Sequence, residues 1–180
     1  RQKEEGFTLI EILIAVLIFM LVGAAALNLL YAGIASQRDS LGRQSTIDQT
    51  SFVAEYMSRS MRAAQKELSA GTCLSLHGLN YELISPNDIK FIDSDGICRE
   101  IFLDSSGGYG VIKETIGAVT NDLTSDDLDV LELTFVLLGE GQGDDRQPRV
   151  TFAMRSKARD ADPETFFQTT ISQRRFDVQE

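Results

Sequence analysis

A single carboxylate, Glu11, interrupts the apolar run that opens the sequence, in the stretch GFTLIEILIAV. No charged residue follows it from Ile12 to Gln37. A carboxylate inside a bilayer costs about 2.5 to 3.5 kcal/mol on insertion scales, so its presence favours a positively charged partner. The alternative is a position near enough to the membrane interface to keep the carboxylate hydrated. The residues alone leave both interpretations open.

The side chains that could carry catalysis are few. His77 is the only histidine, so it would have to be the base of any Ser/His/Asp site, and no nucleophile motif accompanies it. No His/Cys cluster has the spacing of a zinc site. The glycines of GEGQGDD lack the Lys and Ser of a phosphate loop. We therefore expect that the protein is not an enzyme and has no cofactor.

Composition limits the partners. Lys and Arg number 17 against 27 Asp and Glu, a net charge of −10, which argues against a broad electrostatic grip on nucleic acid. With 180 residues, 43% of them hydrophobic, the chain can bury one modest core. We expect one domain behind an N-terminal hydrophobic segment, and no nucleic-acid partner.

The apolar segment is long enough to span a membrane. Residues 12–27 have no polar side chain, and a helix over residues 7–35 exceeds the roughly 30 Å of the hydrocarbon layer. A cleavable secretory signal is the alternative, because AGIAS at 32–36 offers small side chains. Its apolar core would be too long, and RQKEEG carries no net positive charge. We therefore expect residues 7–35 to form a transmembrane helix.

The helical pattern continues beyond the membrane segment. Between residues 36 and 70 the apolar side chains recur mostly at three- and four-residue steps: Phe52, Val53, Tyr56, Met57, Met61, Ala64 and Leu68. The pattern predicts one continuous helix that becomes amphipathic and reaches about Leu68, with Gly71 as its stop.

Residues 71–180 change to the pattern of strands. Short β-branched and aromatic runs alternate with turn residues: IKFI, CREIFL, YGVIKETI, VLELTFVLL, RVTFAMR and FFQTTISQRRF. DSDG at 93–96 predicts a hairpin turn in which Gly96 takes a positive φ, and GEGQGDDRQP at 139–148 predicts a loop. The expected fold class is α+β, a long N-terminal helix packed on a C-terminal antiparallel sheet.

The opening residues GFTLIE, placed directly before a membrane-length apolar run, resemble the processing site of type IV pilins and of the pseudopilins of type II secretion. The resemblance implies that a prepilin peptidase cuts after Gly6, removes the leader 1–6 and methylates the new amino terminus at Phe7. It also implies that the amine of Phe7, on the same or a neighbouring subunit, is the partner of Glu11 in filament assembly.

Two further groups of residues gain meaning from this resemblance. Cys73 and Cys98 would both lie outside the cytoplasm, where a disulfide between them is expected, with two free thiols as the alternative. Many major pilins have their disulfide nearer the C-terminus, which favours a minor pilin or pseudopilin. Asp144 and Asp145 are weak candidates for calcium ligands, because some pseudopilins carry a metal on such loops.

The resemblance thus predicts a structural subunit of a type IV pilus or type II secretion-like filament. Its partners would be other pilin or pseudopilin subunits, the prepilin peptidase, the inner-membrane assembly platform and, before assembly, membrane lipid. It would be a single-pass inner-membrane protein first, and part of an extracytoplasmic or cell-surface filament afterwards. The alternative is a membrane-anchored extracytoplasmic binding or adhesin domain that never polymerises. The two differ in whether the mature chain begins at Phe7.

Overall fold

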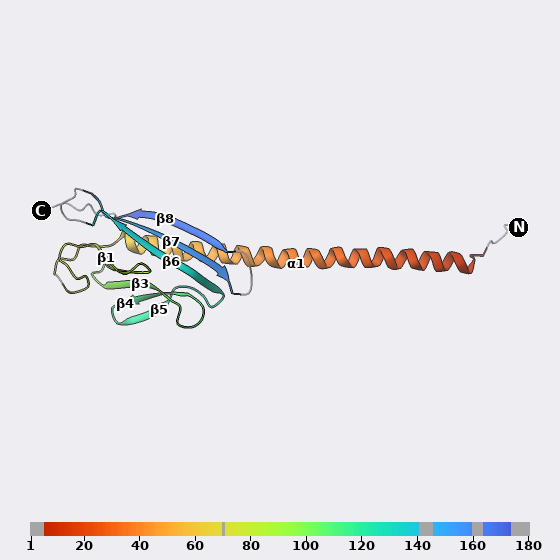
Figure 1. Cartoon of the computed structure of the whole chain (residues 1–180), viewed down its shortest axis with the longest axis horizontal. Coiled ribbons are helices and arrows are strands. Elements are labelled where there is room, and N and C mark those ends of the chain that lie inside the picture. Colours follow the sequence, from red (N-terminus) through yellow and green to blue (C-terminus); the bar gives the residue numbers. More distant parts are fainter. Residues whose placement is uncertain (1–5, 70, 141–145, 160–163, 174–180) are drawn as a thin grey trace. The chain divides into compact units, whose positions relative to one another are not determined.

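The computed structural model describes residues 6–69, 71–140, 146–159 and 164–173. The chain divides into two compact units, Arg1–Leu41 and Gly42–Glu180. One helix, α1 (Leu9–Arg62), begins in the first unit and ends in the second, and all described strands belong to the second unit (Figure 1).

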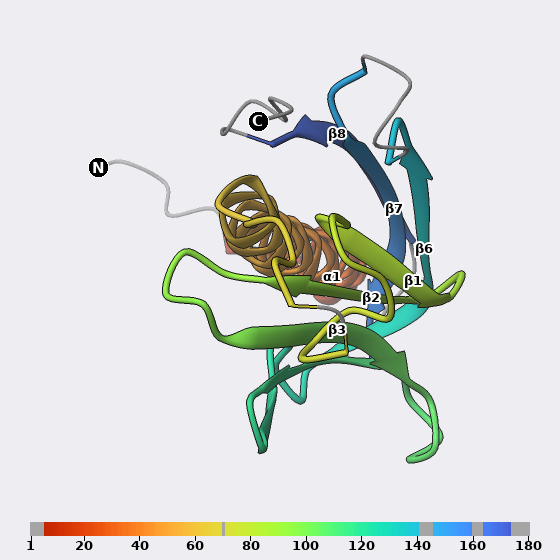
Figure 2. The same cartoon turned by 90° about the vertical axis from the view of Figure 1, so that its left-hand side faces the viewer.

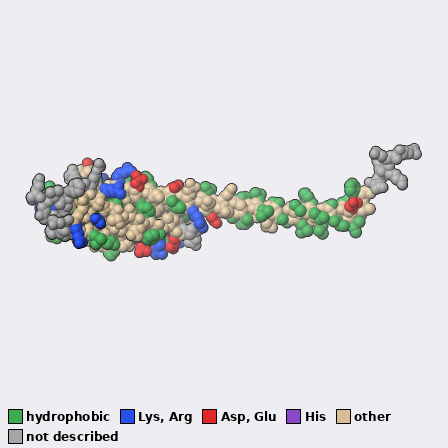
Figure 3. Space-filling view, turned by 90° about the horizontal axis from the view of Figure 1, so that it is seen from above, with side chains coloured by type: hydrophobic (Ala, Val, Ile, Leu, Met, Phe, Trp, Pro, Cys, Tyr) green, Lys and Arg blue, Asp and Glu red, His purple; other side chains and the backbone are tan. Residues whose placement is uncertain are grey.

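The part of α1 in the first unit has the length and composition of a membrane span, and none of its most apolar window is buried. Its large apolar side chains are exposed along this whole part of the helix, from Leu9 at 77% to Ile34 at 46%. Hydrophobic side chains accordingly cover this part of the helix surface (Figure 3). Such a surface is stable only against lipid or against other apolar helices.

In the second unit α1 buries only one of its faces, as the spacing of its apolar residues predicts. The buried residues recur every three to four positions: Thr46, Thr50, Val53, Ala54, Met57 and Met61. The buried Thr50 hydroxyl satisfies its polarity through a 2.9 Å hydrogen bond with the hydroxyl of Ser156. Phe52, on another side of the helix, is 68% exposed.

The prediction that α1 reaches about Leu68 is wrong, because the helix ends at Arg62. The Gln65 amide donates to the Ile92 carbonyl at 2.8 Å, so the backbone there pairs with a strand and leaves the helical ladder. Leu68, counted as part of the apolar helix face, is 74% exposed. Pairing with a distant strand is a tertiary effect that local spacing does not encode.

The strands form two antiparallel sheets rather than the single sheet expected. The first has five strands in chain order: β1 (Tyr81–Ser85), β2 (Asp88–Ile92), β3 (Cys98–Asp104), β4 (Val111–Ile116) and β5 (Val119–Asp122). The second has three, also in chain order: β6 (Leu128–Leu138), β7 (Arg149–Ala158) and β8 (Thr165–Ser172).

The core lies where α1 meets both sheets. Figure 2 shows the helix nearly end-on, with β6, β7 and β8 curving past one side of it and β1, β2 and β3 past another. Met57 and Met61 of α1, Ile101 of β3 and Phe152 of β7 are all fully buried members of one hydrophobic cluster. Burying the apolar face of α1 against two sheets is what stabilises the second unit.

The predicted hairpin at 93–96 is confirmed. The Gly96 amide donates to the Asp93 carbonyl at 3.1 Å, and Gly96 has a φ of 78°, which a residue with a side chain rarely adopts. The Asp93 carboxylate accepts the amides of Asp95 (2.8 Å) and Ile97 (2.9 Å) and so fixes the turn between β2 and β3.

Candidate processing and assembly site

The predicted cleavage bond lies in front of α1. Gly6, Phe7 and Thr8 have no regular secondary structure, and Phe7 is 80% exposed. No atom lies within 4 Å of the position that a Cβ on Gly6 would occupy. The chain itself therefore leaves the Gly6–Phe7 bond open to an enzyme that binds an extended segment.

Glu11 sits in the first turn of α1 and closes a capping box with Thr8. The Glu11 amide donates to the Thr8 carbonyl at 3.1 Å and to its hydroxyl at 3.4 Å, while the Thr8 amide donates to the Glu11 carboxylate at 3.5 Å. The T-x-x-E spacing that announces this motif is present in the sequence, and our sequence analysis missed it. The carboxylate also lies where the helix dipole favours negative charge.

The capping contacts leave the Glu11 carboxylate weakly held. At 3.5 Å, the bonds that it accepts from the Thr8 amide and hydroxyl are at the long limit for hydrogen bonds. Each partner is also a neutral group three residues away. The carboxylate thus keeps its capacity for a stronger, positively charged partner.

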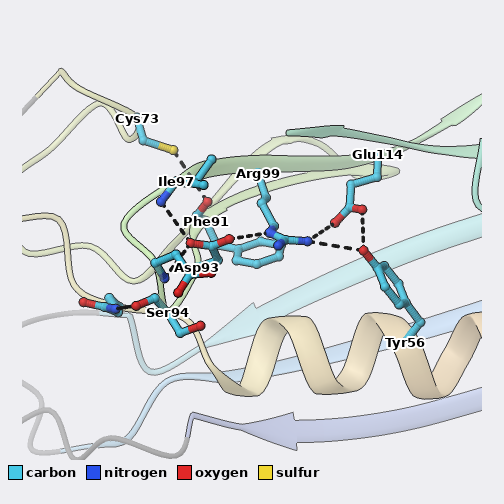
Figure 4. Close-up of polar contacts among 10 residues, drawn as sticks. Tyr56, Cys73, Phe91, Asp93, Ser94, Ile97, Arg99 and Glu114 are labelled. Atoms are coloured by element: carbon cyan, nitrogen blue, oxygen red, sulfur yellow. Dashed lines mark hydrogen bonds and ion pairs between the residues drawn. The ribbon is translucent and has the colours of Figure 1, made fainter. Parts of the chain in front are cut away.

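A second polar constellation, which no sequence pattern predicted, lies inside the second unit. Arg99 of β3 donates to Asp93 at 2.7 Å through Nε and to Glu114 of β4 at 3.0 Å through Nη1 (Figure 4). The Tyr56 hydroxyl of α1 donates to the other Glu114 oxygen at 2.6 Å. The carboxylates of Glu114 and Asp93 are only 2% and 5% exposed.

The pKa values in this constellation follow from burial and charge. Burial alone would raise the pKa of Asp93, but the amides of Ile97 and Asp95 and the Arg99 guanidinium outweigh it and hold that pKa below its ordinary value. Burial, together with the Glu114 carboxylate, raises the pKa of the Tyr56 hydroxyl. Arg99 therefore stays charged between two carboxylates, an arrangement that ties α1 to the first sheet.

Cys73 and Cys98 are joined by a disulfide, with their Cα atoms 5.4 Å apart. It links the segment after α1 to the start of β3. The same segment is held by Glu67, whose buried carboxylate accepts the amides of Ser69, Cys73 and Leu74 at 3.0 to 3.2 Å. These contacts stabilise a segment of little regular structure.

The remaining candidate residues contribute no site in the part of the chain that the structure describes. Asp144 and Asp145 lie outside the described residues. His77 is exposed in the segment before β1. Within the described ranges no three His, Cys, Asp or Glu side chains are arranged to hold a metal ion.

Comparison with known proteins adds one finding. Residues 1–27 match a family model described as the prokaryotic N-terminal methylation motif, the signature of type IV pilins and pseudopilins. The matched range contains the leader, Glu11 and the start of α1. No curated protein and no solved structure matches the chain.

The motif and the fold together favour one class of protein. A long apolar N-terminal helix followed by antiparallel sheets, behind a methylation motif, supports a type IV pilin-like precursor that is anchored in a membrane and processed by prepilin peptidase. The family that carries this motif is structural rather than enzymatic, and its members assemble with other pilin subunits.

Proposed function

We propose that this protein is a structural subunit, a minor pilin or pseudopilin, of a type IV pilus or type II secretion-like filament. The observation that carries the proposal is the methylation motif placed at the start of a helix whose large apolar side chains are exposed from Leu9 to Ile34. Prepilin peptidase would cut after Gly6 and methylate Phe7. Part of α1 would then pass from lipid into the filament core, exchanging one apolar environment for another.

Charge pairing would set the register of that exchange. The new amine of Phe7 is cationic at neutral pH and stays basic after methylation. In an apolar filament core the amine and the Glu11 carboxylate are each costly alone, and docking them together relieves both. A subunit shifted by one residue would leave both unpaired. Glu11 would therefore fix axial position more than it would add net affinity.

The surroundings of the subunit follow from the same proposal. Before assembly the chain would be a single-pass inner-membrane protein, and afterwards part of an extracytoplasmic or cell-surface filament. It would contact other pilin or pseudopilin subunits and the inner-membrane assembly platform. With a net charge of −10, we propose no nucleic-acid partner for this subunit.

The test compares Glu11→Gln with Glu11→Ala in filaments sheared from cells. Gln preserves the capping box and removes the charge, whereas Ala removes both. We expect both variants to insert and to be processed, and both to enter filaments about tenfold less than wild type. Asp39→Asn, an exposed carboxylate further along α1, is the control and should behave as wild type.

Two outcomes count against the proposal, in different ways. If Glu11→Gln enters filaments as well as wild type, the charge has no role in register and capping is the only function of Glu11. If the wild-type protein itself stays in the membrane and is absent from filaments, the filament proposal fails. The membrane-anchored binding domain that never polymerises is then favoured.

A further inference from the structure

We propose that the outer edge of β8, with the groove between β8 and α1, receives an extended, carboxylate-bearing strand of a neighbouring filament subunit. The proposal rests on the proposed function, because it names how one subunit grips the next. β8 differs from the other strands that lie at the edges of the two sheets.

The other edges of the two sheets are covered, short or irregular. β6 donates backbone hydrogen bonds to residues that flank strands of the first sheet, from Val130 to the Gly110 carbonyl at 2.9 Å and from Phe135 to the Pro86 carbonyl at 2.7 Å. β1 has a break in register, and β5 is only four residues long. These are the features by which native proteins prevent unwanted pairing at an edge.

β8 has none of these features. Its eight residues pair with β7 without a break in register, and TFFQTTIS contains no charge and no proline. Among the described residues no strand pairs with its outer edge. In an antiparallel strand every second residue turns its N–H and C=O away from the partner, so a row of backbone groups along this edge points away from β7 and pairs with no described strand. An edge of this kind is a template for strand addition.

A groove accompanies this edge. It has a volume of about 700 Å³ and lies between the last turns of α1 and the end of β8, which stand side by side in Figure 2. Ala63 lines it with apolar surface, and the side chain of Ile171, also among its lining residues, is buried in the core. At its end the side-chain Nε2 of Gln173 donates to the Ala64 carbonyl at 2.8 Å, which fixes the end of β8 to the residues after α1. The groove is therefore a built feature with a fixed wall on each side.

The charged side chains that line the groove favour an occupant that carries carboxylates. Its charged lining residues are Glu55, Arg59 and Arg62, all from α1 and all exposed. Glu55 and Arg59 form an ion pair, which leaves a net positive charge on the rim in a protein whose net charge is −10. An incoming strand with carboxylates would pair with Arg62 and share Arg59 with Glu55, while its backbone continued the sheet.

Proline substitutions at adjacent residues test the backbone part of the proposal. Of Thr169 and Thr170, one points its N–H to β7 and the other points it outward. Proline at the outward position removes no ladder bond and is compatible with an edge strand, but it blocks strand addition. Of Thr169→Pro and Thr170→Pro, the variant that keeps the wild-type unfolding midpoint should enter filaments about tenfold less than wild type.

A photocrosslinker at Thr170 identifies the occupant directly, and it does not depend on the proline variants folding. Benzoylphenylalanine replaces Thr170 in the full chain, filaments are irradiated, and the attached peptide is mapped by mass spectrometry. We expect a peptide from another filament subunit that contains Asp or Glu. The same probe at Leu138 of β6, which is 61% exposed, is the control and should not give this product.

Charge reversal tests the chemistry of the occupant. Arg59→Glu with Arg62→Glu should lower incorporation into filaments about fivefold, whereas Arg155→Glu, an exposed arginine on β7, should leave it unchanged. Incorporation of the double variant at the wild-type level would contradict a carboxylate-bearing occupant.

The remaining outcomes separate this inference from the proposed function. Crosslinks from Thr170 to residues 174–180 of the same chain, to lipid or to nothing would overturn strand addition, as would normal incorporation of a folded proline variant. In each of these cases the wild-type protein is still found in filaments. Its absence from filaments is the result that defeats the proposed function.

Discussion

Arg99 shows how one side chain can join three parts of the second unit. It contacts Asp93 in the hairpin after β2, Glu114 on β4 and, at 3.2 Å, the hydroxyl of Tyr56 on α1. Both carboxylates are nearly fully buried, so each depends on the guanidinium for compensation of its charge. The constellation thus fixes the helix against the first sheet.

Replacing Glu114 by Gln should lower the free energy of unfolding by about 2 kcal/mol, because Arg99 keeps Asp93 but loses its second charged partner. The measurement is denaturant unfolding of the full chain in detergent. Glu132→Gln is the matched control, because Glu132 also pairs with an arginine, Arg155 at 3.3 Å, but is 58% exposed. That variant should change stability by less than about 0.5 kcal/mol. Equal effects of the two substitutions would contradict the account.

The raised pKa of Asp88 predicts that the stability of the fold depends on pH. Burial, with the nearby Glu100 carboxylate, raises the pKa of Asp88 to about 6, while Lys90 opposes the shift. The folded state therefore holds a proton that the unfolded state, with a pKa near 3.9, releases earlier. The difference between the two pKa values lowers the free energy of unfolding as the pH rises from about 4 to about 6, and the loss is complete above that range.

Asp88→Asn removes this penalty. Above pH 6 the variant should be more stable than wild type by about 1 kcal/mol, a value reduced for the partial exposure of the side chain. Near pH 3.5 the two proteins should be equally stable. The measurement is the difference in unfolding free energy between them across pH, which cancels the other titrating groups. A difference that does not change with pH would show that the Asp88 pKa is not raised.

At the scale of elements, local patterns predicted what local interactions decide. The helix, the turn at 93–96 and six of the eight strands that the structure describes could be predicted from spacing and turn residues. The end of α1 could not, because it depends on Gln65 pairing with the distant Ile92. β5 was missed because its residues are all exposed and show no alternation. The described strands divide into two sheets because β6 does not pair with β5, and the local pattern of neither strand encodes that choice.

The disulfide belongs to this scale, because it fixes the segment between α1 and β1 to β3. Closing a loop of 25 residues contributes about 3.5 kcal/mol in the chain-entropy model. Cys73→Ser with Cys98→Ser should therefore lower the unfolding free energy by about 2 to 4 kcal/mol. Alkylation of protein from cells provides the direct check. Both thiols should react only after reduction, and labelling of both without reduction would exclude the bridge.

At the scale of the whole molecule, the two units differ in how much of each the sequence alone predicts. The methylation motif of the first unit was predictable, because Gly6, Phe7 and Glu11 belong to the contiguous stretch GFTLIE in front of an apolar run. The Arg99 constellation was not, because Tyr56, Arg99 and Glu114 are up to 58 residues apart and no spacing rule connects them. The sequence motif of the first unit supports the proposed function, and three-dimensional contacts stabilise the second unit.

The amino terminus of the mature protein tests the central claim most directly. Mass spectrometry of protein from cells should find a chain that begins at Phe7 with a methylated amine. The Gly6→Val variant should keep residues 1–6, because a branched side chain obstructs the peptidase and not the fold, which leaves open space around Gly6. A wild-type chain that retains its leader and an unmethylated Phe7 would contradict the account of this protein as a processed filament subunit.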